Sequence, residues 1–185
     1  MYKRQDYTYL ASGVPGTVYG LLEAHKNFGV LTLEQIMKPV IEQAENGIVV
    51  SNDLNYVIDV TPQLRTDPES FSIFFDNGEP LKEFSIMKRP DLANTFKEIS
   101  KHGTKGFYEG IVADKIVEAM EKNGGLITHD DLKTYKSFFR MPIALNYKGH
   151  MVYTAGPPSG GGITLLTALG AVSYTHLRAH ETRTH

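Results

Sequence analysis

Seven residues, Gly156 to Gly162, constrain the fold of this 185-residue chain more than any other stretch. They read Gly-Pro-Pro-Ser-Gly-Gly-Gly and join a short apolar segment, residues 151–154, to a strongly apolar run, residues 163–172. Two prolines fix the backbone on entry, and three glycines permit positive φ or very close packing before a helix begins. The sequence therefore predicts a tight strand-to-helix turn whose backbone has to hold one position.

Two functional interpretations of this turn are weaker than the structural one. A glycine-rich loop before a helix can hold a phosphate, but this one lacks the Lys and Ser/Thr of a P-loop and does not match GxGxxG. Ser159 could act as a nucleophile, yet the GxSxG elbow needs glycine where Pro157 stands. A phosphate-binding domain that uses Gly160 to Gly162 therefore ranks third, well behind the two functional hypotheses that the rest of the sequence supports.

Composition describes an ordinary globular protein and excludes several classes of function. The chain is 41% apolar and 22% charged, which is typical of soluble domains. Its net charge of -2 and its lack of a Lys/Arg cluster argue against a nucleic-acid partner. The absence of cysteine excludes disulfides, zinc ribbons and thiol catalysis. No apolar run approaches the roughly 20 residues that a membrane-spanning helix needs.

Hydrophobic periodicity and capping signals predict a helix-rich α+β domain. We expect helices near residues 17–28, 33–46, 51–60, 91–102, 110–122 and 128–135. Thr17 is expected to cap the first helix. Thr32, followed three residues later by Gln35, is expected to form a capping box at the start of the second, and Pro39 is expected to kink or locally break that helix. We further predict a polar loop over 61–70, a strand over 71–75 closed by a turn at 76–78, and a hairpin of residues 143–147 and 151–154.

The candidate chemical groups each have a simpler structural explanation. Residues 129–131, His-Asp-Asp, resemble a small acid/base or metal cluster. However, Thr128 followed three residues later by Asp131 matches a capping box, and acidic residues favour a helix start. His25 and His102 show no ligand spacing. The residues alone therefore predict no catalytic, substrate-binding or metal site.

The last thirteen residues differ in character from the rest of the chain. His176 and His180 have the i, i+4 spacing that suits a metal on a helix, and His185 follows them, but nothing apolar organises a helix there. We predict a native segment over residues 1–172, with its last helix abandoned after Val172. Residues 173–185 resemble translated sequencing adapter and are expected to be non-native. Genomic codons for them in the source DNA would contradict this hypothesis.

Several separated blocks, all in the same order, carry a family resemblance. They are residues 10–18 (Leu-Ala-Ser-Gly-Val-Pro-Gly-Thr-Val), 33–47 around Pro39-Val40, 91–95, 106–113, 123–132 with Tyr135, and 157–162. From Leu10 to Val172 the chain thereby resembles the large subunit of the γ-glutamyltransferases, or glutathione hydrolases. One departure is Gly160, which stands where the family usually has the second of two serines.

The resemblance implies a fold, an activity and partners. The fold would be part of an N-terminal-nucleophile hydrolase αββα sandwich, of which this chain is a helix-rich large-subunit segment. A self-cleaving precursor would expose a threonine at the start of the small subunit, and that threonine would attack γ-glutamyl amides such as glutathione. The γ-glutamyl group would then pass to water, an amino acid or a peptide, with no metal or organic cofactor. The complete protein is expected in the periplasm or outside the cell.

The same resemblance places the chemistry outside this chain. The catalytic threonine is expected after its last residue, and the arginine that receives the substrate α-carboxylate is expected before its first. Arg65, Arg89 and Arg140 do not lie in surroundings that match the family motif. We therefore expect the segment by itself to be inactive. The alternative hypothesis is a non-catalytic helical interaction domain of the same fold.

Overall fold

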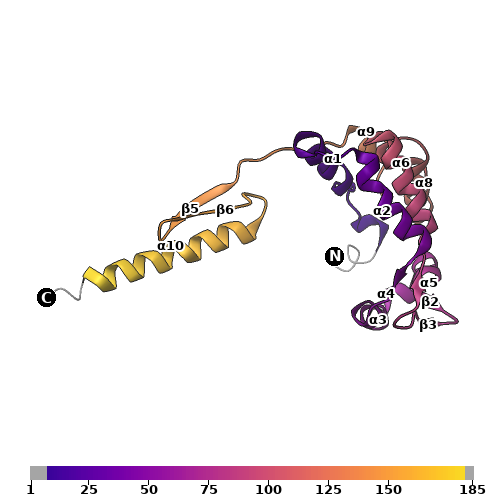
Figure 1. The fold of residues 1–185 in the computed structure, drawn as a ribbon, viewed down its shortest axis with the longest axis horizontal. Helices are drawn as coiled ribbons and strands as arrows, with labels where there is room; N and C mark the ends of the chain where they lie inside the picture. Colours follow the sequence, from indigo (N-terminus) through magenta and orange to yellow (C-terminus); the bar gives the residue numbers. More distant parts are fainter. Residues whose placement is uncertain (1–7, 182–185) are drawn as a thin grey trace. The chain divides into compact units, whose positions relative to one another are not determined.

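The computed structural model describes residues 8–181, with side chains described through residue 173. The chain forms two compact units, residues 1–137 and residues 138–185. Within the described residues the first unit is mostly helical, and the second is a β-hairpin with one long helix (Figure 1). The fold is thus a helix-rich α+β arrangement, as predicted.

The first unit consists of short and medium helices with very little strand. Its helices are α1 (Thr17–Phe28), α2 (Leu33–Asn46), α3 (Asn52–Asp59), α4 (Gln63–Thr66), α5 (Pro68–Phe74), α6 (Pro90–His102), α7 (Lys105–Tyr108), α8 (Gly110–Asn123) and α9 (His129–Thr134), after a 3-10 turn at Tyr9–Ala11. Two antiparallel ribbons pair β1 (Ile48–Val49) with β4 (Ile86–Met87), and β2 (Phe75–Asp76) with β3 (Glu79–Pro80). Helix packing, α2 on α6 and α7 on both α6 and α8, therefore holds this unit together.

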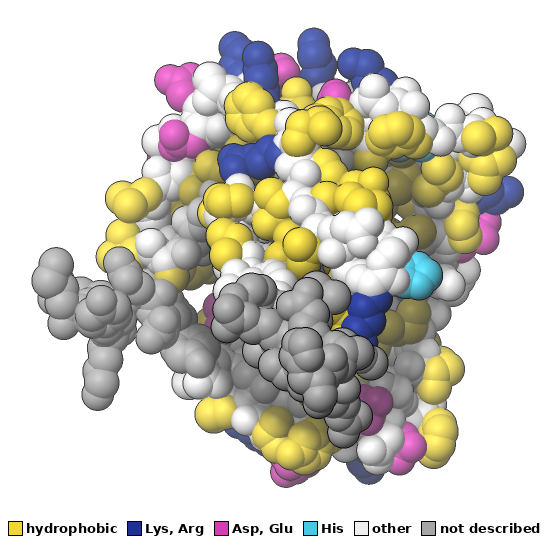
Figure 2. Space-filling view, turned by 90° about the vertical axis from the view of Figure 1, so that its left-hand side faces the viewer, with side chains coloured by type: hydrophobic (Ala, Val, Ile, Leu, Met, Phe, Trp, Pro, Cys, Tyr) yellow, Lys and Arg dark blue, Asp and Glu magenta, His cyan; other side chains and the backbone are white. Residues whose placement is uncertain are grey.

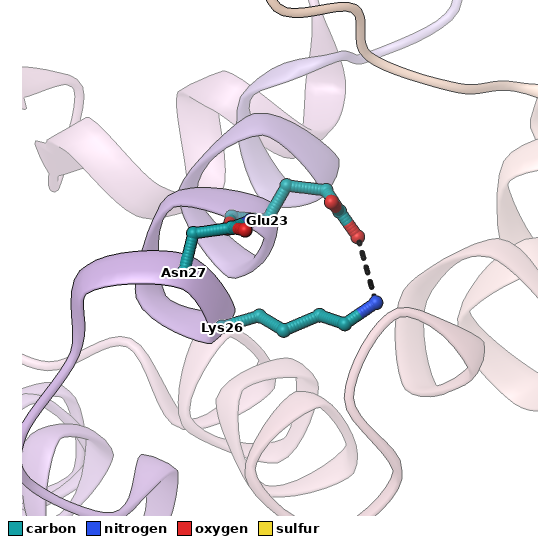
Figure 3. A network of polar contacts seen from close by, with 3 residues as sticks. All are labelled: Glu23, Lys26 and Asn27. Carbon is teal, nitrogen blue, oxygen red and sulfur yellow. Dashed lines mark hydrogen bonds and ion pairs between the residues drawn. The ribbon is translucent and has the colours of Figure 1, made fainter.

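Polar contacts near the end of α1 stay on the surface of that helix (Figure 3). Lys26 Nζ lies 3.8 Å from Glu23 Oε1, and Asn27 Nδ2 donates to the Glu23 carbonyl at 2.7 Å. An exposed pair of this kind is worth about 0.5 kcal/mol or less. At the other end Gly16 is the cap and Thr17 is the first helical residue, so the predicted capping role of Thr17 is wrong.

The start of α2 follows directly from its sequence. Thr32 Oγ1 accepts a hydrogen bond from the Gln35 N–H at 3.2 Å, and Gln35 Oε1 accepts one from the Thr32 N–H at 2.9 Å. This reciprocal pair confirms the predicted capping box. The helix then continues past Pro39 to Asn46, so the predicted local break is absent. Pro39 cannot donate a backbone hydrogen bond, and the helix that contains it packs along α6.

Residues 61–75 differ from the prediction. The chain forms α4 and α5 in place of a polar loop and a strand, and only Phe75 and Asp76 enter a strand. Asp67 Oδ2 accepts from the Ser70 N–H at 2.8 Å, and Pro68 occupies the first turn, where its missing N–H has no cost. This cap starts a helix ahead of an apolar run that is too short for periodicity to distinguish helix from strand.

The core of the first unit gathers around α7 and α8. Its centre is Tyr108, which is 5% exposed. The Tyr108 hydroxyl donates to the Pro15 carbonyl at 2.5 Å and accepts from the Tyr19 N–H at 3.1 Å. These bonds join the turn before α1 to a residue about ninety positions later in the chain. The buried members of this core are Tyr108, Ala113, Val117, Met120, Ile127 and Leu132.

Two further tyrosines complete the packing around Tyr108. Tyr135 stacks on Tyr108 with ring centroids 5.7 Å apart, and Tyr19 meets both rings edge-on at 5.8 and 6.0 Å. Gly16 approaches this cluster so closely that a Cβ there would lie 2.0 Å from the Tyr135 hydroxyl oxygen. Any larger residue at position 16 would therefore displace an aromatic ring from the core.

The spacing of apolar residues in α8 predicts an inward face of Val112, Ile116, Ala119 and Met120, and the buried face is shifted slightly from it. Met120 is buried as expected, whereas Val112 and Ile116 are only half-buried. Ala113 and Val117, one position further along, are the residues that face the core fully. A short helix with apolar residues on two adjacent stripes does not by itself specify which stripe is buried.

The second unit places the predicted hairpin against one helix. Strands β5 (Ile143–Tyr147) and β6 (His150–Thr154) pair antiparallel, from Ile143 opposite Thr154 to Tyr147 opposite His150. Helix α10 (Gly160–Glu181) packs against β5. It does not stop at Val172, so the predicted end of the helix is wrong. Residues 173–181 contain neither Gly nor Pro to stop it.

Large apolar side chains remain exposed in both units, and Figure 2 shows hydrophobic side chains spread over the face it draws. Val30 is 96% and Phe28 76% exposed in the first unit, and Met141 is 87% and Phe138 77% exposed in the second. Apolar surface of this extent marks places where a protein contacts something else. None of the helices among the described residues has both the length and the apolar character to cross a membrane.

Replacing Tyr108 by Phe tests the role of its hydroxyl. The Tyr108→Phe variant leaves the Pro15 carbonyl and the Tyr19 N–H without their partner, and we expect it to lower the free energy of unfolding by about 1–3 kcal/mol. Urea unfolding followed by circular dichroism measures the change. Tyr56→Phe is the matched control, because Tyr56 is 63% exposed. Equal effects of the two substitutions would contradict the assigned role.

Candidate functional site

The segment that the sequence singles out, Gly156 to Gly162, connects β6 to α10. Its first half is a compact turn in which the Ser159 N–H donates to the Gly156 carbonyl at 3.1 Å. The peptide bond between Pro157 and Pro158 is cis. Arg140, which precedes β5, donates from Nη1 to the Pro157 carbonyl at 2.9 Å. The turn is thus held by a hydrogen bond between two of its own residues and by one from Arg140.

The three glycines after Ser159 form the first turn of α10 rather than a loop before it. None of them has a positive φ. Gly162 is buried, and a Cβ on it would lie 2.2 Å from the Ala155 carbonyl oxygen and 2.6 Å from Thr154 Oγ1. Gly160 and Gly161 have open space at the same position. Of the two predicted reasons for glycine, close packing applies, and it applies to Gly162.

A shallow hollow of about 500 Å³ lies beside this turn. It is mainly apolar, with Met141 and the two prolines in its lining, and Arg140 and Ser159 add polar groups. Within the described part of the chain, no histidine or carboxylate hydrogen-bonds to the Ser159 hydroxyl. The hollow therefore offers a positive charge and a hydroxyl, but no base that would make Ser159 a nucleophile.

The His-Asp-Asp segment is a helix start, as predicted. Thr128 Oγ1 accepts from the Asp131 N–H at 3.3 Å, and Asp131 Oδ2 accepts from the Thr128 N–H at 2.9 Å. Hydrogen bonds from the Thr128 side chain and backbone hold the pKa of Asp131 below its usual value. His129 Nε2 lies 2.9 Å from Asp114 Oδ1 and links α9 to α8. No three His, Asp or Glu residues in the described part of the chain are placed to hold a metal ion.

Two other histidines, His25 and His102, have local partners. His25 Nε2 lies 2.8 Å from the Leu31 carbonyl oxygen, across the connection between α1 and α2. His102 Nε2 lies 3.8 Å from Glu98 Oε2 on the same helix. The side chains of His176, His180 and His185 lie outside the described residues.

The three arginines considered from the sequence contact this chain itself. Arg65 Nη1 donates to the Gly78 carbonyl at 2.8 Å, and its guanidinium lies 4.5 Å from the centre of the Phe75 ring. The Arg89 guanidinium lies 6.0 Å from the Phe74 ring centre. Arg140 is the one that reaches the candidate segment. Sequence reasoning missed this role because no motif surrounds residue 140, and only the hairpin brings it beside the turn.

The chain is similar to known proteins of one family. The family model described as Gamma-glutamyltranspeptidase matches residues 1–185, and the chain belongs to this family. It is 37% identical over 172 residues to a glutathione hydrolase proenzyme of Escherichia coli (strain K12), covering 90% of this chain and 29% of that protein. It is 41% identical over 158 residues to the capsule biosynthesis protein CapD proenzyme of Bacillus anthracis, covering 85% and 28%.

Solved structures agree with this assignment. The Helicobacter pylori gamma-glutamyltranspeptidase superposes with a TM-score of 0.88 at 36% identity, covering 91% of this chain and 49% of that one. The Bacillus anthracis transpeptidase CapD gives 0.73 at 32% identity, covering 91% and 66%. The predicted family is confirmed. The chain spans less than a third of the length of these curated relatives.

Alanine substitutions in the first turn of α10 separate close packing from helix propensity. Gly162→Ala places a methyl group against the Ala155 carbonyl, and we expect it to destabilise the second unit by about 1–3 kcal/mol. Gly161→Ala is the matched control, which we expect to be neutral or stabilising by up to about 1 kcal/mol. Thermal melting of both variants measures the difference. Similar melting temperatures would show that Gly162 is not sterically required.

The cap of α9 predicts a pH effect with a definite sign. Because the pKa of Asp131 is lower in the folded protein than its ordinary value of 3.8, its stabilisation is present above that value and is lost as the pH falls below it. Asp131→Asn keeps an acceptor but does not titrate. We expect the stability difference between the native protein and this variant to shrink on acidification, as measured by urea unfolding at a series of pH values. A difference independent of pH would contradict the assignment.

Proposed function

We propose that this chain is part of a γ-glutamyl acyltransferase or hydrolase that acts on glutathione and related γ-glutamyl compounds. The observation that carries the proposal is the 37% identity to a glutathione hydrolase proenzyme over 90% of the chain. The backbone agreement with the Helicobacter pylori gamma-glutamyltranspeptidase, at a TM-score of 0.88, also supports it. Similarity that extends through helices, turns and hairpin together argues for shared function more strongly than one motif does.

The proposed chemistry runs through a threonine at the start of a small subunit cut from the same precursor. Its hydroxyl oxygen attacks the γ-glutamyl carbonyl carbon and forms an ester, while its own amine takes the hydroxyl proton and passes a proton to the departing amine. Backbone N–H groups stabilise the oxyanion. Water, an amino acid or a peptide then attacks the ester and releases the threonine. In the complete protein, an αββα sandwich is proposed to position these groups.

We assign a structural role to the described residues in this scheme. Ser159 has no basic partner in the described part of the chain, and His129 is paired with Asp114 on the surface of α8. Arg65 and Arg140 donate to carbonyls of the chain itself. The segment alone is therefore proposed to be inactive. Its exposed apolar side chains fit the proposal that a small subunit and the rest of the precursor cover them.

Two further features of the complete protein are proposed on the family resemblance. The complete protein is proposed to lie in the periplasm or outside the cell, and to work without a metal or organic cofactor. Cell fractionation of a host that produces the complete protein checks the first. Turnover that is unchanged after treatment with a metal chelator checks the second.

The experiment that tests the proposed function begins with the source DNA on both sides of this frame. The complete protein is then expressed and examined for self-cleavage and for hydrolysis of γ-glutamyl-p-nitroanilide. We expect two subunits and a rate at least about 1,000-fold above that of a variant whose exposed threonine is replaced by alanine. Residues 1–185 alone are expected to give no turnover.

Other outcomes would contradict the proposal. A genuine stop codon after His185, or a complete protein that neither cleaves itself nor hydrolyses the substrate, would favour the non-catalytic interaction domain. Turnover by residues 1–185 alone would contradict the assignment of catalysis to a downstream threonine. The same DNA sequence decides whether residues 173–185 are genomic.

A further inference from the structure

Three Asn-Gly pairs occur in this chain, at 46–47, 77–78 and 123–124. An asparagine before glycine is the sequence most open to attack by the next backbone nitrogen on the side-chain amide, because glycine has no Cβ to hinder the approach. From the sequence alone, the three pairs are expected to react equally. In the structure their surroundings differ.

Two of the pairs end helices, and there the attacking nitrogen is occupied. The Gly47 N–H donates to the Gln43 carbonyl at 2.9 Å, and the Gly124 N–H donates to the Met120 carbonyl. The Asn123 amide is held as well, because its Nδ2 donates to the Ala119 carbonyl at 2.8 Å. A backbone nitrogen must give up its proton to attack, so these sites react only after the helix end opens.

The third pair forms the two-residue turn between β2 and β3. Asn77 and Gly78 have φ values of 51° and 85°, which places both in the left-handed region typical of a tight hairpin turn. The Asn77 side chain is exposed, and no atom lies within 4 Å of where a Gly78 Cβ would be. Among the described residues, no carbonyl accepts the Gly78 N–H. The strands beside it are two residues long, and the Gly78 carbonyl accepts from Arg65 Nη1, so the turn is held at this carbonyl and not at the attacking nitrogen.

We propose that Asn77 is a site of spontaneous deamidation, and that its turn selects it over the other two pairs. The Gly78 nitrogen bonds to Asn77 Cγ, and the side-chain nitrogen leaves as ammonia, carrying the proton lost from Gly78. The product is a five-membered succinimide. One water molecule then opens this ring at either carbonyl and leaves an aspartate or an isoaspartate at position 77. No oxidant, metal or enzyme is consumed.

The modification changes the contacts of the turn in a defined way. Asn77 Nδ2 donates to Asp76 Oδ1 at 3.1 Å, and deamidation replaces this donor with a second carboxylate beside the first. An isoaspartate also adds one methylene to the main chain of a two-residue turn. The Gly78 carbonyl, which accepts from Arg65 Nη1 at 2.8 Å, then moves away from its partner. The modified hairpin is therefore more open than the original.

Peptide mapping tests the proposal on the folded chain. The protein is incubated in mildly alkaline buffer, with circular dichroism to confirm helix content, and is digested at intervals. Mass spectrometry then gives the amide-to-acid conversion at each pair, and electron-transfer fragmentation identifies isoaspartate. We expect conversion at Asn77 at least about tenfold faster than at Asn46 or Asn123, which is the cost of opening one helix-end hydrogen bond. In denaturant the three rates are expected to converge.

Asn77→Gly is the matched control, because glycine also accepts a positive φ and has no amide to lose. It should abolish conversion at position 77 and leave the rates at Asn46 and Asn123 unchanged. Equal native rates at the three pairs would overturn the proposal, as would conversion at Asn77 that appears only in denaturant. If the isolated chain aggregates, the same rates are measured on the complete protein, and they test the proposal in the same way.

Discussion

The hydroxyl of Tyr108 makes the contact on which the first unit depends. It accepts from the Tyr19 N–H and donates to the Pro15 carbonyl, so one buried oxygen joins the turn before α1 to the end of α7. Burial raises the pKa of Tyr108, which keeps the hydroxyl protonated and able to donate. The stacked Tyr135 ring closes the cluster over Gly16. The family block at residues 10–18 thus has a physical reason, because its backbone lies against aromatic rings.

In the second unit, as in the first, the backbone of a family block is packed so closely that a larger residue would not fit. Its helix begins so close to the end of β6 that only glycine fits at position 162, and Arg140 donates to the Pro157 carbonyl. In the family blocks at residues 10–18 and 157–162, the backbone therefore lies against other backbone atoms or against an aromatic ring. Neither block holds a nucleophile next to a base that could activate it. This geometry supports the proposal that the chain is a structural segment of a γ-glutamyltranspeptidase-family protein. The three Asn-Gly pairs differ in their structural positions. Two of them lie at the C-terminal ends of helices, and the third forms the turn between β2 and β3.

Local sequence predicted those features that local interactions decide. The capping boxes at Thr32 and Thr128 satisfy backbone groups within three residues, so they form in the structure as expected. The β5–β6 hairpin was also predicted, because its turn residues are visible in the sequence. The family was predicted because its motif blocks occur in the same order along the chain. The candidate segment at 156–162 was located in the same way. Its chemistry, and the activity of the complete protein, remain proposals.

Tertiary structure decided what depends on partners distant in the chain. Pro39 stays inside a continuous helix where α6 packs alongside, and α8 buries Ala113 and Val117 rather than the neighbouring stripe. Residues 68–74 form a helix started by Asp67 although their apolar run is typical of a strand. The roles of Arg140 and Tyr108 have no sequence signal. The sequence by itself determined the capping boxes at Thr32 and Thr128 and the β5–β6 hairpin, since those interactions span a few residues. Only the folded chain decided which faces are buried and which polar groups meet, since those depend on contacts up to about ninety residues apart.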